Sequence, residues 1–299
     1  MTVASINAGG DFRVSEVLSR SWSVFTRNII FFLAVPLVVQ GIYFIINAAL
    51  GRTFAVFRMA PASVRILPSA PGMVQPSPWI IALVSIVTII IFLCLYMFGQ
   101  GVLLTGAFQR LRGEPLRVGA ALQRALARLV PLVVLSILIT LAMIGVGLAY
   151  IALMWILGLV LGRFVAVLSF LIFVPIFMLG VLWSVVVPAC LVEGLGPIES
   201  MARSADLTKG YRWKVTGIML LLGLIALAAV IILVILFSLM WSTNMFLFII
   251  QHPLVVLIIE ATGFIVWTGY INCVIIMIYH DLRVTKEGID TSQLASVFD

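Results

Sequence analysis

One carboxylate of this sequence stands inside a long apolar run. Of the eleven acidic residues, only Glu260 falls within a stretch long enough to span a membrane. A charged side chain at that depth is costly unless it is paired, protonated or directed toward a polar cavity. Glu260 is therefore a candidate site for a proton or a cation. The competing interpretation is structural, with Glu260 as a partner for Arg163 or Asn244 near one membrane face.

Other polar residues in apolar runs extend this candidate. Gln100, Asn272 and Arg163 complete a candidate intramembrane polar site around Glu260. Amides in membrane spans more often hydrogen-bond between helices than bind a substrate. The sequence contains no Gly-rich phosphate loop, no HExxH, no GxSxG and no paired His/Asp cluster. We therefore expect a protein that is not an enzyme, with no catalytic residue, no cofactor and no metal site.

The composition indicates how these residues are positioned. Of 299 residues, 64% are hydrophobic and 10% are charged, whereas a soluble domain has about half and about a quarter. A span needs about 20 apolar residues, and six stretches qualify. They are residues 28–50, 79–106, 130–157, 164–192, 215–241 and 254–279. The sequence predicts an all-α polytopic membrane protein with about six transmembrane helices.

The basic residues predict the orientation of these spans. All but four of the 18 Lys and Arg residues fall on one side; the exceptions are Arg52, Arg58, Arg65 and Arg163. The positive-inside bias then places both termini in the cytoplasm, and we expect a bacterial cytoplasmic (inner) membrane. Residues 51–78 form an external proline-rich loop in this arrangement, and residues 286–299 form a cytoplasmic tail.

An amphipathic stretch precedes each span that leaves the cytoplasm. When the three stretches are aligned on Arg20, Arg124 and Arg203, a large apolar residue lies two positions earlier in each. The chain therefore divides into three hairpin repeats of approximately residues 12–110, 111–195 and 196–285, each led by a cytoplasmic amphipathic helix. These helices are either lipid-binding elements or ordinary elements that fix the positions of the spans.

Basic amphipathic helices lie in the headgroup layer and favour anionic lipid. The candidate headgroup contacts are Arg20, Arg27, Arg124, Arg128 and Lys214. The partners expected are membrane lipids, mainly anionic ones, and a membrane-protein partner is a further option. No nucleic-acid partner is expected, because the basic residues are explained by membrane topology.

Two cytoplasmic segments carry a family resemblance. They are VPACLVEGLGPIES, which continues to residue 214, and YHDLRVTKEGID at residues 279–290. Together they resemble the bacterial family called the glycerophosphoryl diester phosphodiesterase membrane domain. The soluble phosphodiesterase barrel of that family needs its own His, Glu and Asp metal site, which this chain lacks. The resemblance implies a six-span membrane module and carries no catalytic residue onto this sequence.

The charged residues of these segments suggest an ion-pair cluster at the ends of spans four and six. Its candidate members are Glu193, Glu199, Arg203, Lys209, Arg212, Asp281 and Arg283. We expect the acids at the two span ends, Glu193, Asp281 and Glu287, to pair with Arg203, Lys209 or Arg212. These pairs would lock the third amphipathic helix against the two span ends.

Three functions fit these observations. The first is a non-enzymatic multi-pass membrane protein that organises lipids or partner proteins. The second is a transporter or flippase-like protein for a lipid or a small hydrophobic substrate, with a path near Glu260. The third is the membrane subunit of an enzyme whose catalytic chain is encoded separately.

Overall fold

The computed structural model describes residues 12–54, 77–162, 169–240 and 253–288. Every secondary-structure element in these ranges is a helix, so the predicted all-α polytopic class is confirmed. Arg163, Asn244, most of the predicted external loop (55–76) and the tail beyond residue 288 lie outside the described residues.

Six helical segments in the described ranges are long and apolar enough to cross a membrane. Five are single helices: α2 (Ile29–Phe54), α3 (Pro78–Leu111), α5 (Leu129–Leu161), α10 (Arg212–Met240) and α12 (Pro253–Glu287). The fourth consists of α7 (Phe173–Leu182) and α8 (Val186–Val192), preceded by the short 3-10 helix η3 (Ser169–Ile172). The six segments match the six predicted stretches.

The fourth span is interrupted between α7 and α8, at residues 183–185. Pro188 is the third residue of α8. Proline has no N–H to donate, and its ring collides with the carbonyl group four residues earlier, here that of Ser184. The interruption therefore lies one turn before the proline. It changes the direction of the chain near the end of the fourth span.

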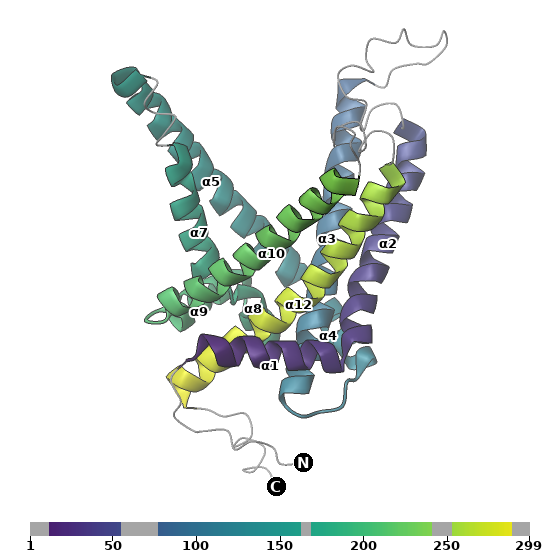
Figure 1. Ribbon diagram of the computed structural model, residues 1–299, viewed down its shortest axis with the longest axis vertical. Coiled ribbons are helices and arrows are strands. Elements are labelled where there is room, and N and C mark those ends of the chain that lie inside the picture. The colour runs from purple at the N-terminus through teal and green to yellow at the C-terminus, as the bar shows by residue number, and fades with distance from the viewer. Residues whose placement is uncertain (1–11, 55–76, 163–168, 241–252, 289–299) are drawn as a thin grey trace.

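Three shorter helices, α1 (Val14–Arg27), α4 (Val118–Ala127) and α9 (Pro197–Thr208), precede α2, α5 and α10. All three lie at one end of the bundle (Figure 1), and we call them the amphipathic layer. In this layer α1 packs along α12, α4 packs against α3, and α9 packs against α8. Tyr270 of α12 meets the rings of Trp22 and Phe25 of α1 edge-on, at centroid distances of 5.8 and 5.7 Å.

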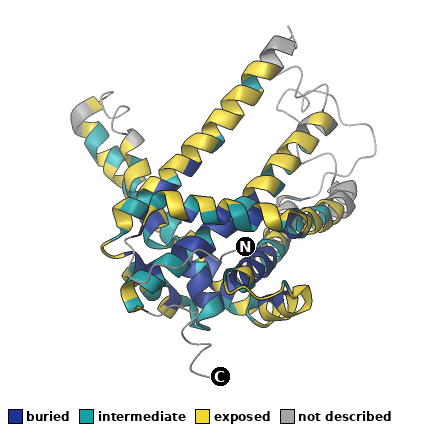
Figure 2. Cartoon of the chain, turned by 60° about the horizontal axis from the view of Figure 1, so that its bottom comes forward, coloured by how far each residue is buried: buried dark blue, intermediate teal, exposed yellow. Residues whose placement is uncertain are grey.

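The buried core also lies at the end of the bundle that carries the amphipathic layer (Figure 2). Side chains with no exposed surface come from spans and layer helices alike: Phe32, Leu132, Leu207, Ile218 and Tyr279. Toward the opposite end, α5 and α7 diverge from α2 and α3 (Figure 1), and apolar side chains such as Leu148 and Ile231 are exposed. A helix satisfies its own backbone hydrogen bonds, so these halves need only the apolar bilayer around them.

Glycines of the spans differ in how closely another helix approaches them. Gly158 and Gly162, at the end of span three, have open space around them, since a Cβ added at either position would meet no described atom within 4 Å. At Gly269 of α12, by contrast, an added Cβ would lie 2.5 Å from the backbone oxygen of Phe32. The junction of α1, α2 and α12 therefore depends on this glycine.

Candidate functional site

A group of charged side chains joins α9 to the ends of spans four and six. The Nε of Arg203 donates a hydrogen bond to Glu193 at 2.9 Å, and another guanidinium nitrogen of Arg203 donates to Glu287. The Tyr279 hydroxyl donates to Glu193 at 2.7 Å, and Arg283 donates to Glu287 at 3.0 Å. We call these five residues the α9 junction. They connect one amphipathic helix to two span ends.

The junction is partly shielded from solvent. The side chains of Arg203, Glu193 and Glu287 are 24%, 14% and 22% exposed. Burial disfavours the charged guanidinium, but hydrogen bonds and charge attraction from the two carboxylates outweigh it and raise the pKa of Arg203 above its usual value. The two carboxylates therefore stabilise the charged form of Arg203.

The structure brings together three members of the predicted ion-pair cluster, Glu193, Arg203 and Arg283. Glu287 was also expected to pair with Arg203, Lys209 or Arg212, and it pairs with Arg203. Its spacing of four residues from Arg283 places both side chains on one helix face. Sequence reasoning missed Tyr279. Nothing in the sequence pattern distinguished Tyr279, because it ends an apolar run.

The other four members of the predicted cluster lie elsewhere: Glu199, Lys209, Arg212 and Asp281. Glu199 is exposed and accepts a hydrogen bond from the backbone N–H of Gly196 at 3.1 Å, which stabilises the start of α9. Lys209 and Arg212 are exposed, and neither forms an ion pair with a described carboxylate. Asp281 approaches Arg20 of α1 at 3.8 Å, so the expectation that it pairs with α9 or with the start of α10 was wrong.

Two arginines at α4 bind the backbone where span four ends. Arg124 donates to the carbonyl oxygen of Val192 at 3.2 Å, and Arg128 donates to that of Gly194 at 2.8 Å. Gly194 has a φ of +73°, and a Cβ at this position would lie 2.6 Å from a guanidinium nitrogen of Arg128. Glycine is therefore required here both for the left-handed turn and for the approach of Arg128.

The remaining candidate headgroup contacts differ in what surrounds them. Arg20 forms an ion pair with Glu16 at 2.6 Å, and the Lys214 ammonium lies 5.5 Å from the centre of the Tyr211 ring. Arg27 is exposed in the last turn of α1 and forms no ion pair with a described carboxylate. Of the five candidates, Arg27 is thus the one whose side chain forms no hydrogen bond, ion pair or ring contact with a described residue.

Two of the candidate intramembrane polar residues, Glu260 and Asn272, lie far apart on α12. Glu260 is exposed, whereas Asn272 is completely buried on the same helix. Twelve residues of α helix separate them by about 18 Å along the axis. Asn272 donates to the Thr268 carbonyl at 2.7 Å, and its Oδ1 has no partner among the described residues. Gln100 is buried in α3, and Arg163 lies outside the described residues.

Replacing Glu260 with glutamine is expected to leave the melting temperature of the purified protein within about 2 °C of wild type. The reason is that Glu260 is exposed and has no hydrogen bond or ion pair with a described residue, so removing its charge breaks no described contact. Thermal unfolding in detergent measures this. A loss of more than about 5 °C would show that Glu260 has a structural partner.

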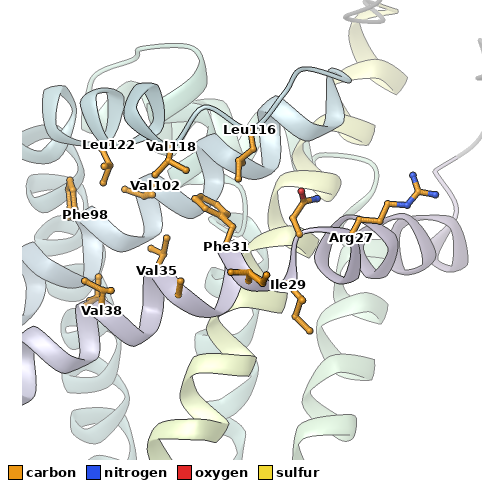
Figure 3. Close-up of a pocket in the computed structure, with 14 residues that line it drawn as sticks. Arg27, Ile29, Phe31, Val35, Val38, Phe98, Val102, Leu116, Val118 and Leu122 are labelled. Atoms are coloured by element: carbon orange, nitrogen blue, oxygen red, sulfur yellow. The ribbon is translucent and has the colours of Figure 1, made fainter.

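A groove opens between α2, α3 and α4 (Figure 3). Its volume is about 610 Å³, and apolar side chains line it except at one end, where Arg27 and Asn28 lie. Phe31 and Val35 of α2 face Val102 of α3 across the groove, and Leu122 of α4 covers it from the side of the amphipathic layer (Figure 3). The groove therefore offers a hydrocarbon surface that begins at the membrane interface.

Within the described residues, no group of three or more His, Cys, Asp or Glu side chains is placed to hold a metal ion. In comparisons with known proteins, no family model, no curated protein and no solved structure matches this chain.

Proposed function

We propose that the chain is a non-enzymatic membrane module that organises anionic lipid on the cytoplasmic side of a bacterial inner membrane. One observation carries the proposal: every helix of the amphipathic layer exposes a large apolar side chain. Trp22 of α1 is 57% exposed, Leu126 of α4 is 65% exposed and Ile198 of α9 is 73% exposed. Basic residues accompany these side chains on the same layer.

Exposed apolar and basic side chains on one layer match the chemistry of a headgroup region. An interfacial helix buries its apolar face at the acyl boundary and directs its cations toward lipid phosphates. Each Lys or Arg near an anionic surface contributes about 1 kcal/mol of attraction. Because three such helices surround the span ends, their attractions act on the same patch of the leaflet.

The cytoplasmic orientation and the family assignment belong to the same proposal. The excess of Lys and Arg on the side of the amphipathic layer supports a cytoplasmic position. The segments at residues 187–214 and 279–290 support membership of the phosphodiesterase membrane-domain family, and all five residues of the α9 junction fall in them. A role as a membrane subunit for a separately encoded enzyme is compatible with lipid organisation.

The transporter alternative is less well supported. It requires Glu260 to meet other polar residues along a path through the bundle. Glu260 is exposed on α12, about 18 Å along the helix from the buried Asn272. The groove between α2, α3 and α4 is lined mainly by apolar side chains, which suit hydrocarbon and not an ion.

The proposal is tested by the lipid selectivity of the protein in a bilayer. Spin-labelled phosphatidylglycerol and phosphatidylcholine are compared for the fraction immobilised around the reconstituted protein. The wild type should prefer phosphatidylglycerol, and the triple change Arg110→Gln, Arg117→Gln and Arg212→Gln, all at exposed positions, should reduce the preference about two-fold.

The control removes the same charge from the other side of the membrane. Arg52→Gln, Arg58→Gln and Arg65→Gln together should preserve the selectivity, because these residues lie in or beside the predicted external loop. Equal losses in both triple variants, or no preference in the wild type, would contradict the proposed function.

A further inference from the structure

We propose that the groove between α2, α3 and α4 binds one acyl chain of a phospholipid from the leaflet on the side of the amphipathic layer, with the lipid phosphate at Arg27. This inference rests on the proposed function, since it names one lipid and one site within the layer. The groove, its length and the unpaired charge at its mouth each support it separately.

The lining of the groove selects a hydrocarbon occupant. All of its lining residues are apolar except Arg27 and Asn28. A polar group placed deep in the groove would lose its hydrogen bonds to water and find no replacement, which costs several kcal/mol. The inner part of the occupant is therefore an aliphatic chain.

The length of the groove corresponds to one leaflet. Its lining residues on α2 run from Ile29 to Val39, which is about 15 Å of helix. The hydrocarbon core of a bilayer is about 30 Å thick, so the groove ends near the midplane. A transmembrane helix of a partner would be expected to contact α2 along the whole core, whereas a lipid chain needs only this half.

The polar end of the groove carries an available cation. Arg27 lies at the mouth, and Figure 3 shows its side chain directed away from the apolar lining. The acidic residue of α1, Glu16, lies at the other end of the helix and pairs with Arg20. Arg117, between the lining residues Leu116 and Val118, is also exposed. A phosphate outside the groove is therefore attracted while its chain lies inside.

The experiment uses native mass spectrometry of the full-length protein, purified in mild detergent and supplied with phosphatidylglycerol or phosphatidylcholine of identical chains. One tightly retained lipid per chain is expected, with phosphatidylglycerol preferred. The change Ala34→Trp, which fills the groove from α2, should reduce retention of both lipids at least about ten-fold. The matched control Leu37→Trp, on an exposed position of α2 outside the groove, should retain the wild-type lipid.

A second pair of variants tests the headgroup. Arg27→Gln should lower phosphatidylglycerol affinity about five-fold and leave phosphatidylcholine unchanged. Arg13→Gln, at an exposed position beside the other end of α1, should change neither. If instead Arg27→Gln still prefers phosphatidylglycerol as the wild type does, the lipid phosphate does not bind at Arg27, and this placement of the headgroup is overturned.

The groove assignment is overturned if Ala34→Trp retains lipid like the wild type. Should Ala34→Trp unfold, Val38→Trp replaces it, because Val38 also lines the groove and is 57% exposed. The spin-label selectivity of the same variants separates the two proposals. If Ala34→Trp loses the retained lipid but keeps the bilayer selectivity, the retained lipid binds in the groove. If the wild type shows the bilayer selectivity but retains no lipid, the groove proposal is refuted and the proposed function stands.

Discussion

Replacing Arg203 with methionine is expected to destabilise the purified protein by about 2–3 kcal/mol, or about 5–10 °C in melting temperature. Methionine keeps most of the volume of the arginine stem but provides no donor. Glu193 then keeps only the Tyr279 hydroxyl, and Glu287 keeps only Arg283. Because both carboxylates are mostly buried, water replaces the lost hydrogen bonds poorly.

Two comparisons distinguish loss of the junction from loss of any arginine. Arg212→Met removes an exposed basic residue at the start of α10 and should cost less than about 0.5 kcal/mol. Arg203→Lys keeps the charge but cannot bridge two carboxylates with a planar fork, so it should recover only part of the loss. In a double-mutant cycle, Arg203→Met and Glu193→Gln should be less than additive, and full additivity would show that their pairing contributes nothing.

The membrane architecture was readable from the sequence because the bilayer imposes it. Span length and apolarity follow from the thickness of the hydrocarbon core, so all six spans were predicted. Helices α1, α4 and α9 fall in the three stretches whose periodicity predicted helices. Helix α9 ends at Thr208, and Gly210 follows it with a φ of +89°. The break at residues 183–185 lies in the turn before Pro188, because proline acts on the preceding turn.

Ion-pair partners were less predictable, because a pairing depends on how helices that are distant in sequence cross. Arg203 and Glu193 are ten residues apart, and the short connection to α9 brings them together. Asp281 is also near the end of span six, but α1 crosses α12 there and supplies Arg20 as the partner. The periodicity of one helix does not report the crossing position of another.

The sequence did not predict the groove, for a related reason. Leu122 lies two residues before Arg124 in the second amphipathic stretch, and Phe31 and Val102 fall inside predicted spans. Their common surface exists only because α4 packs against α3 beside α2. For Glu260 the sequence suggested a buried charge, because its neighbours in sequence are apolar. The structure instead places Glu260 on an exposed face of α12.

Replacing Gly269 with alanine is expected to destabilise the protein by about 1–3 kcal/mol through a single added methyl group. The Cβ would lie 2.5 Å from the backbone oxygen of Phe32 and 3.1 Å from the Phe25 ring. A side chain could rotate away, but a backbone oxygen in the first turn of α2 moves only if the helix moves. Such a shift would disturb the contact of α1 with α12, on which the Trp22 and Phe25 rings meet Tyr270.

Gly263 provides the matched control, six residues earlier on the same helix. It is exposed, and a Cβ at this position would meet no described atom within 4 Å. Alanine there should be neutral or should stabilise α12 by up to about 1 kcal/mol, because glycine is the poorer helix former. The measurement is thermal unfolding of both variants in the same detergent and at the same scan rate. If both alanines behave alike, the close approach of α2 to α12 does not limit stability, and helix propensity alone accounts for the effect of the substitution.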